Sequence, residues 1–515
     1  MREAKRIAII GAGMGGLSAA AILARQARVT VFERADGPGG KIRQNEAGAH
    51  RIDSGPTVFT MRWALENVFE AAGARMDEHL VLEPQETLAR HYWPDGTTLD
   101  LFADTGRSAE EITRVFSRQE GDRYRAFCER AQRVFETLKG PFIEADRPSF
   151  LGLMSQRSPL ALLETAPFST LWSYLSSAFS EPKLQQLFGR YATYCGASPF
   201  AAPATLMLVA HVEQAGVWSL EGGMQALPTA LETVAKQNGA AVNYGADVTE
   251  IIETDGAVRG VRVDGRVQPF DTVVMNGDVA ALRSGNMGQT GSAAVPRTSP
   301  PARSQSAMTW TGLARPTGKP LSYHTVCFSD DYGAEFDAVF KQRTVPLAPT
   351  VYLCAPDRAS GRQPDGPERI FCLINAPANG DTRAYSPEEI DQCHKRMERA
   401  LERCGIALKL LPETVTAITP ETFADRFPQT GGALYGMASH GWRASFQRPG
   451  IRTRLKGLYL AGGSVHPGPG VPMAALSGRA AATAILKDYG LTSGFPKAVT
   501  AGGISTPSVQ TAPTG

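Results

Sequence analysis

The chain has 515 residues, of which 43% are hydrophobic and 20% charged, values typical of a globular protein. Its 53 basic and 51 acidic residues leave a formal net charge of +2 without a long basic run, which excludes a nucleic-acid footprint. Seven scattered cysteines without a CxxC pair indicate neither a zinc site nor a disulfide framework, so we expect no metal and a reducing, cytoplasmic setting. No run reaches the roughly 18 uninterrupted apolar residues of a membrane-spanning helix, and the N-terminus lacks the pattern of a signal peptide.

The N-terminal segment predicts a β-α-β unit. RIAII is a short apolar run typical of a buried parallel strand, and the glycine-rich and then alanine-rich run after it predicts a helix. GAGMGG fits G-x-G-x-x-G: Gly11 permits a tight turn, Gly13 lets the backbone approach a pyrophosphate, and Gly16 lets the helix pack on the strand. The N–H groups of the helix N-terminus would face the phosphates. The cofactor-binding residues expected here are Gly11, Ala12, Gly13, Gly15 and Gly16.

The second strand, RVTVFE, ends in Glu33, which is placed to accept hydrogen bonds from a ribose diol. An acid at this position repels a 2′-phosphate, so the adenosine half matches FAD or NAD and not NADP. The stretches ERADGPGGKIR and RIDSGPT follow closely, with a second run of small residues and an acid that a simple NAD domain does not have. They resemble the extended motif of the FAD-dependent oxidoreductases of the flavin amine oxidase and phytoene desaturase superfamily. The resemblance places Arg34, Gly40 and Lys41 along the pyrophosphate and Gly55, Pro56 and Thr57 near the flavin ring, and we add Val248 to the cofactor-binding residues.

The middle of the chain changes from strands to helices and back. Residues 81–100 alternate and contain PDG, which predicts strands and a turn. Residues 108–138 have helical spacing, with a capping-box pattern at Ser108 and Glu111. Helical patterns continue to about residue 213, followed by short strands in residues 240–275 and 325–374 and an amphipathic helix in residues 387–405.

Apolar and aromatic side chains gather in the helical part. They would line a tunnel or dip into a bilayer, and the alternative is that they form ordinary core. These residues are Leu160 to Leu163, Phe168, Leu171, Trp172, Tyr174, Leu175, Phe179 and Phe188.

The C-terminal stretch VHPGPGVPMAALSG follows a predicted strand, LYLAG, and opens a predicted helix. The flavin half of FAD needs its own small-residue turn and helix N-terminus, and this stretch matches that need. Gly462 and Gly463 would allow the backbone close to the ribityl chain and phosphate. Val471, Pro472 and Met473 would begin the helix that faces the pyrimidine end, and proline is well tolerated at a helix start.

The residues after Gly463 depart from the Gly-Asp pair that ends this motif in many flavin enzymes, because Ser464 and HPGPGVP follow. The departure resembles the bacterial carotenoid desaturases, as does EGGMQALPTAL. DYGAEFDAVF and ASHGWRASFQRPG resemble more particularly the 1-hydroxycarotenoid 3,4-desaturases, also called methoxyneurosporene or hydroxyneurosporene dehydrogenases. The resemblance covers residues 6–488.

This resemblance implies FAD-dependent desaturation of an acyclic 1-hydroxy or 1-methoxy carotenoid at C3–C4, in carotenoid biosynthesis of the spheroidene or spirilloxanthin type. A hydride would pass from C4 to flavin N5, and a proton would leave C3. No second G-x-G-x-x-G is present, so we expect the electrons to pass to a quinone or oxygen, or to a further partner. Because a carotenoid is insoluble in water, we expect a cytoplasmic protein peripheral on the inner, photosynthetic membrane.

Candidate groups to accept the proton or meet the 1-hydroxyl are His324, Asp331, His440 and His466, which lie in or near the family-like stretches. A lone histidine is more often a hydrogen-bonded structural residue than a catalytic one. Asp331 is equally suited to cap a helix beginning at Ala334.

The expected fold class is α/β, with a Rossmann-like FAD-binding domain of this superfamily and a helical plus β-sheet substrate domain. The expected parts are a discontinuous FAD-binding domain (1–95, 215–283 and 441–490), a mainly helical insertion facing substrate or membrane (96–214), a substrate domain (304–440), a flexible loop (285–303) and a disordered tail (491–515).

The alternative functions are phytoene desaturation or carotenoid isomerisation on the same scaffold, or a non-catalytic lipid-binding protein like the Rab escort and GDP-dissociation-inhibitor proteins. The intact glycines of both motifs and Glu33 favour a cofactor. Ser464 after Gly463 makes an amine oxidase less favoured.

Overall fold

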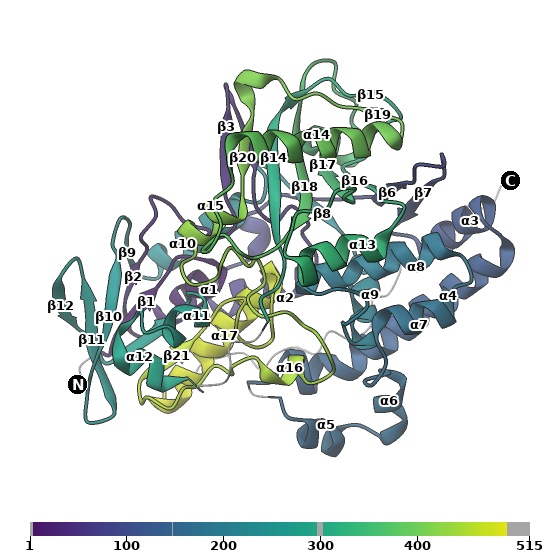
Figure 1. Ribbon diagram of the computed structural model, residues 1–515. Helices are drawn as coiled ribbons and strands as arrows, with labels where there is room; N and C mark the ends of the chain where they lie inside the picture. The colour runs from purple at the N-terminus through teal and green to yellow at the C-terminus, as the bar shows by residue number, and fades with distance from the viewer. Residues whose placement is uncertain (1–3, 147, 296–301, 492–515) are drawn as a thin grey trace, which may run out of the picture.

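The computed structural model describes residues 4–146, 148–295 and 302–491. Its parallel sheet with helices α1 and α17 lies on the left of Figure 1, a second sheet lies at the top, and helices α3 to α9 lie at the lower right. The expected tail, except Leu491, falls outside the described residues. The expected loop at 285–303 contains helix α12 (Gly288–Ala294), while residues 296–301 fall outside the described part.

The first sheet has five parallel strands in the order β21-β13-β1-β2-β9. Its strands come from distant parts of the chain: β1 (Arg6–Ile10), β2 (Arg28–Phe32), β9 (Ala241–Asn243), β13 (Thr272–Met275) and β21 (Leu458–Leu460). Ile7 and Ile9 of β1 are fully buried because helices cover the sheet on its faces. The helices packed in this region are α1 (Met14–Leu23), α2 (Arg62–Ala71), α10 (Ala226–Gln237) and α17 (Val471–Asp488).

Helices α1 and α17 meet through small residues, which brings the two cofactor motifs side by side. A Cβ at Gly478 would lie 2.0 Å from the carbonyl oxygen of Gly15, so only glycine allows this approach. The contact explains why the second glycine-rich motif, far along the chain, adjoins the first (Figure 1).

The second sheet has seven strands in the order β20-β14-β18-β17-β16-β6-β7. Only the β16–β6 pair is parallel, and the other pairs are antiparallel. The expected boundary between residues 95 and 96 falls inside the β6–β7 hairpin, so β6 belongs to this sheet rather than to the cofactor sheet. We propose that the other domain limits lie where the sequence predicts them. The strands are β6 (Thr87–Tyr92), β7 (Thr98–Phe102), β14 (Ser306–Ala314), β16 (His324–Cys327), β17 (Val351–Cys354), β18 (Glu368–Ala376) and β20 (Thr416–Ile418).

Smaller elements complete the two sheet regions. β10 (Val248–Thr254), β11 (Ala257–Val263) and β12 (Arg266–Pro269) form an antiparallel sheet at the left of Figure 1. The two-stranded pairs are β3 (Gln44–Ala47) with β4 (His50–Asp53), β5 (Leu82–Pro84) with β8 (Trp218–Leu220), and β15 (Thr317–Gly318) with β19 (Ile406–Ala407). The remaining helices near the sheets are α11 (Val279–Arg283), α13 (Tyr332–Asp337), α14 (Pro387–Arg403), α15 (Pro420–Arg426) and α16 (Ala444–Gln447).

The helical segment begins with α3 (Thr105–Val115) and α4 (Arg118–Leu138). Their N-caps are Asp104 and Ser117, which accept the N–H groups of Arg107 and Glu120. The expected capping box at Ser108 is therefore wrong, because Ser108 is buried inside α3 and its hydroxyl bonds the carbonyl of Phe102. The other helices are α5 (Phe150–Gln156), α6 (Pro159–Glu164), α7 (Leu171–Ala178), α8 (Pro182–Gly189) and α9 (Leu208–Gln214).

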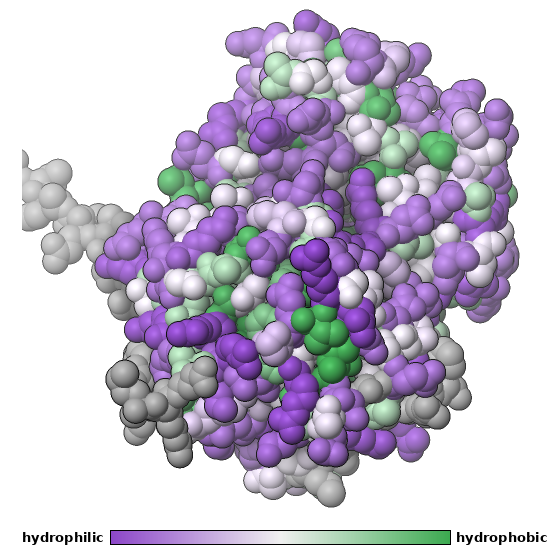
Figure 2. Space-filling model, turned by 90° about the vertical axis from the view of Figure 1, so that its left-hand side faces the viewer, coloured by the Kyte–Doolittle hydropathy of each residue, from purple (hydrophilic) through white to green (hydrophobic). Residues whose placement is uncertain are grey.

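The apolar residues of this segment divide into core and surface. Four of them form buried core: Leu171, Leu175, Phe179 and Phe188. Leu160, Leu163 and Phe168 are instead 77%, 64% and 71% exposed. No described helix is both long enough and apolar enough to cross a bilayer. The face shown in Figure 2 is mainly hydrophilic, with a compact hydrophobic group below its centre.

Candidate functional site

One large cavity, of about 610 Å³, is bounded by both expected cofactor motifs and by the seven-stranded sheet. Most of the predicted cofactor residues line it: Gly11, Gly13, Gly15, Glu33, Arg34, Gly40, Lys41, Gly55, Pro56, Thr57, Val248, Gly462, Gly463, Val471 and Pro472. Ala12, Gly16 and Met473 are not among its lining residues. Ala12 nevertheless contributes its backbone, because its N–H donates to Glu33 Oε2 at 2.7 Å.

The N-terminal turn is shaped by close backbone approaches. Gly11 has φ +96°, which favours glycine, and a Cβ at Gly16 would lie 2.1 Å from the carbonyl oxygen of Gly11. A Cβ at Gly15 would lie 2.6 Å from Asn276 Oδ1 and 2.7 Å from the backbone nitrogen of Gly462. Only glycine therefore allows this close packing of the turn, and a pyrophosphate on its cavity side stays a prediction of the motif.

Asn276 is a site residue that the sequence analysis did not find. It follows strand β13, lines the cavity and donates from Nδ2 to the carbonyl of Gly11 at 3.1 Å. The signal was present in MNGD at the end of a predicted strand, since ligands of parallel sheets bind at the carboxyl ends of strands.

Charged groups flank the cofactor part of the cavity. Glu33 is 8% exposed and also accepts the N–H of Ala35 at 2.9 Å, so its carboxylate is held in one orientation at the end of β2. The Lys41 ammonium donates to the carbonyl of Leu434 at 2.6 Å, and burial lowers the pKa of Lys41. Arg34 is exposed and donates to the carbonyl of Asp425 at 2.7 Å.

The C-terminal turn is held by serines. The N–H of Gly462 donates to Ser477 Oγ at 2.7 Å, and Ser464 Oγ accepts the N–H of Val279 at 3.0 Å. Ser464 lines the cavity where other flavin enzymes carry aspartate, so this departure ties the turn to α11. The N-terminus of the 18-residue helix α17 faces the cavity through Val471.

The residues present fit FAD. The glycine turn, the Glu33 carboxylate at the end of β2 and a second helix N-terminus surround one continuous cavity, and a dinucleotide needs all three.

The cavity continues beyond the cofactor residues toward the seven-stranded sheet, where Tyr352, Phe371 and Leu373 line it. The Tyr352 hydroxyl lies 2.6 Å from Thr57 Oγ1 and 2.7 Å from His324 Nδ1. His324 is buried, and burial lowers its pKa to about 3, so its imidazole is neutral. Its Nε2 has no hydrogen-bond partner among the described residues. The predicted residues Thr57 and His324 are thus joined by Tyr352, which had no sequence motif.

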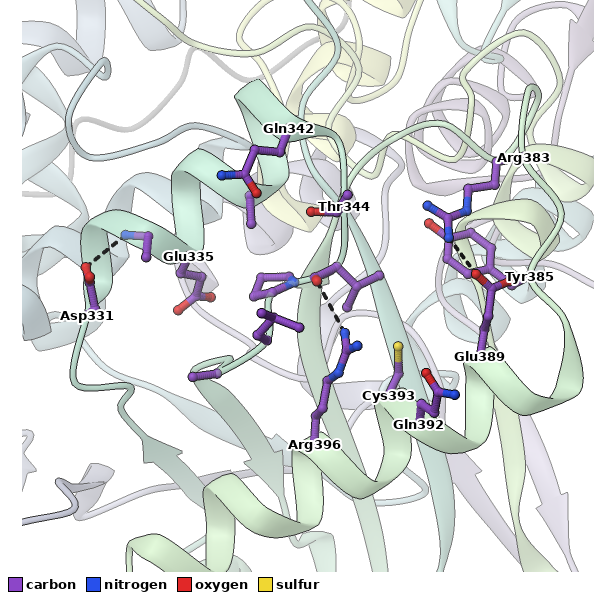
Figure 3. A pocket seen from close by; sticks show the side chains of 16 residues that line it. Asp331, Glu335, Gln342, Thr344, Arg383, Tyr385, Glu389, Gln392, Cys393 and Arg396 are labelled. Atoms are coloured by element: carbon purple, nitrogen blue, oxygen red, sulfur yellow. Dashed lines mark hydrogen bonds and ion pairs between the residues drawn. The ribbon is translucent and has the colours of Figure 1, made fainter.

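The other predicted polar candidates lie apart from this cavity. Asp331 is exposed and caps α13 by accepting the N–H of Ala334 at 2.9 Å, so the capping alternative is confirmed, although the helix begins at Tyr332. Figure 3 shows Asp331 at the rim of a different pocket, between α13 and α14. His440 Nε2 accepts the N–H of Ser198 at 3.0 Å.

His466 is also engaged with the protein rather than with the cavity. Its buried ring donates from Nε2 to the carbonyl of Phe142 at 2.7 Å, and burial lowers its pKa to about 4. These contacts match the structural interpretation of a lone histidine, and His324 alone among the three histidine candidates bonds a cavity-lining side chain.

The comparisons with known proteins agree with this geometry. The sequence profile described as "Flavin containing amine oxidoreductase" matches residues 14–486, and the chain belongs to that family. The protein is therefore an FAD-dependent oxidoreductase, which confirms the expected cofactor and fold class.

Two relatives point to one branch of the family. The chain is 48% identical to hydroxyneurosporene desaturase of Rubrivivax gelatinosus over 513 residues, which is 98% of each protein. It is 29% identical to 1-hydroxycarotenoid 3,4-desaturase of a Flavobacterium species, over 93% of this chain and 99% of that one. The expected resemblance to bacterial carotenoid desaturases is confirmed.

The solved structures show the fold alone. Cyclohexylamine oxidase from Brevibacterium oxydans superposes with a TM-score of 0.57 at 15% identity, covering 95% of this chain and 100% of that one. A putrescine oxidase superposes with a TM-score of 0.58 at 14% identity, covering 94% and 99%.

Proposed function

We propose that this protein desaturates an acyclic 1-hydroxy or 1-methoxy carotenoid at C3–C4 in carotenoid biosynthesis. The similarity to hydroxyneurosporene desaturase over nearly the whole chain carries the proposal. The cavity supports it, because apolar and aromatic side chains continue from the cofactor motifs into the seven-stranded sheet. A polyene requires such walls, since it offers almost no hydrogen-bonding group.

Bound FAD would accept the hydride that leaves C4. The chain's part is to hold C4 beside the Gly55–Thr57 turn in a site from which water is excluded. Phe371 and Leu373 of β18 and Tyr352 of β17 present the walls for this purpose.

The proton lost from C3 would pass to the Tyr352–His324 pair. With the Nε2–H tautomer of the neutral imidazole, the phenol would donate to Nδ1, so it could take up a proton on its cavity side while giving its own to His324. A weak base is sufficient, because a carbon next to a polyene cation is strongly acidic.

The electrons would leave to a quinone or oxygen, and the substrate would come from a membrane surface. Exposed apolar side chains on and beside helices α5 and α6 suit peripheral contact with lipid: Met154, Leu160, Leu163 and Phe168. We propose the cytoplasmic face of the inner, photosynthetic membrane as the location.

The test is turnover of FAD-loaded protein with carotenoid in liposomes, followed by chromatography and mass spectrometry. We expect 1-hydroxyneurosporene to lose two hydrogens and phytoene to remain unchanged. Conversion of phytoene alone would move the assignment to the earlier desaturase, and isomerised product of unchanged mass would move it to an isomerase. A protein that binds carotenoid without converting it would be a carrier.

A further inference from the structure

A half-buried arginine, Arg190, lines the cavity together with the residues of the seven-stranded sheet. Arg190 begins the short 3-10 helix Arg190–Cys195, and the same turn presents Thr193 and Tyr194 to the cavity. Its Nε atom is enclosed by the protein and has no hydrogen-bond partner among the described residues, so a ligand in the cavity would meet the terminal N–H groups of the guanidinium. Burying a charge or a donor without a partner is costly, so an arginine on the wall of an apolar cavity requires an explanation.

The surroundings of Arg190 hold its charge in place without using its Nε donor. Glu213 of α9 accepts the hydroxyls of Tyr191 at 2.7 Å and Tyr194 at 2.5 Å. The Arg190 guanidinium lies 5.3 Å from the centre of the Tyr194 ring. Burial raises the pKa of Tyr194, so this hydroxyl stays protonated and donates to the carboxylate.

This cluster lies near the turn that is expected beside the flavin. Burial is the main cause of the lowered pKa of His324, and the nearby charge of Arg190 lowers it further. His324 in turn bonds the Tyr352 hydroxyl, which lies next to Thr57. Thr57 belongs to the turn expected beside the flavin. A polar group of the substrate that met Arg190 would therefore lie close to the carbon being oxidised.

We propose that Arg190 receives the oxygen on C1 of the carotenoid and thereby determines which substrates are desaturated. This inference rests on the proposed function. C1 is only a few bonds from C4, so an oxygen held by Arg190 places C3–C4 beside the cofactor turn, and the polyene extends away along the apolar walls. Because a guanidinium only donates hydrogen bonds, it accepts an alcohol and an ether alike, and both 1-hydroxy and 1-methoxy carotenoids satisfy it. A carotenoid with a bare hydrocarbon end leaves the donor unpaired and is rejected.

The test compares 1-hydroxyneurosporene, its 1-methoxy ether and neurosporene in liposomes. Relative kcat/KM and, with FAD kept reduced under anaerobic conditions, equilibrium binding are measured for wild type, Arg190→Leu and Arg190→Gln. We expect wild type to prefer both oxygenated carotenoids over neurosporene by roughly 10- to 100-fold, the range of one charge-assisted hydrogen bond. Arg190→Leu should lose this preference, and Arg190→Gln, which keeps an amide donor, should fall between.

Controls distinguish failure of this inference from misfolding of a variant and from failure of the proposed function. Arg107 stacks on Phe102 at 3.9 Å outside the cavity, so Arg107→Leu should keep the wild-type preference. FAD content of each variant reports folding, and Arg190→Gln supplies the comparison if Arg190→Leu does not fold. If wild type converts no 1-hydroxycarotenoid, the proposed function fails. If wild type converts it and both Arg190 variants keep the full preference, the inference alone is overturned.

Discussion

Gly15 is the position where a single added carbon should most clearly disturb cofactor binding. A Cβ there would lie 2.6 Å from Asn276 Oδ1, 2.7 Å from the nitrogen of Gly462 and 2.9 Å from the carbonyl oxygen of Ala474. Ordinary contact begins near 3.4 Å, so each of these contacts is short by roughly 0.5–0.8 Å. Asn276 follows β13, whereas Gly462 and Ala474 lie in the turn and helix that follow β21, and the last two neighbours are backbone atoms.

Gly15→Ala must therefore separate the two glycine-rich turns. Overpacking of this kind costs about 1–3 kcal/mol. If that cost falls on the bound geometry, the FAD dissociation constant rises roughly 5- to 150-fold, since about 1.4 kcal/mol corresponds to a factor of ten. Titration of apoprotein with FAD, followed by flavin fluorescence, measures the constant.

A matched control uses the next glycine-containing loop. Gly37 has no atom within 4 Å of an added Cβ, and its φ is outside the left-handed region, so Gly37→Ala should bind FAD as wild type does. Equal dissociation constants for wild type and Gly15→Ala would refute the geometry of the paired turns.

Three further predictions concern charge. Glu33→Ala should weaken FAD binding about tenfold or more in the same titration, because it removes a charged hydrogen-bond acceptor, and an unchanged constant would contradict the ribose role. Arg358→Met should lower the free energy of unfolding in denaturant by about 3–5 kcal/mol, because Glu368 loses its counter-ion and its side chain is only 2% exposed. A loss below about 1 kcal/mol would show that the ion pair is dispensable. Burial lowers the pKa of His91 and His324 to about 3. The contribution of these two histidines to the free energy of unfolding is therefore fully present above about pH 6.5. It falls as the pH drops toward 3, by about 1.4 kcal/mol per pH unit for each histidine. The free energy of unfolding, measured in denaturant at pH 7 and pH 5, should show this dependence on pH. In His91→Gln the slope should be smaller by the contribution of about one proton. The same slope in wild type and in His91→Gln would contradict the lowered pKa of His91.

The cofactor half of the site was predictable because its residues act through local backbone geometry. Gly11 and Gly15 shape a turn within a few residues, and Glu33 follows directly from the next strand, so spacing alone indicates the role. Asn276 belongs to the same class, since it ends a predicted strand of the same sheet.

The part of the cavity beyond the cofactor residues was not predictable in this way. Tyr352 and Arg190 come from a strand and a short helix with no repeated spacing, and only the tertiary fold brings them to one cavity. The type of an apolar residue does not predict whether its side chain is buried either. Phe168 is exposed, whereas Phe188 lies in the core. Local signals also compete: Ser108 has the capping pattern, but Asp104 lies at the real helix start.

The central claim is that reducing equivalents pass from a hydroxylated carotenoid to FAD bound between the two motifs. The most direct measurement is anaerobic mixing of FAD-loaded protein with 1-hydroxyneurosporene in liposomes, with the flavin and carotenoid spectra followed together. The account predicts bleaching of the flavin with an equimolar red shift of the carotenoid by one conjugated double bond. A flavin that stays yellow while the carotenoid spectrum remains unchanged would contradict it.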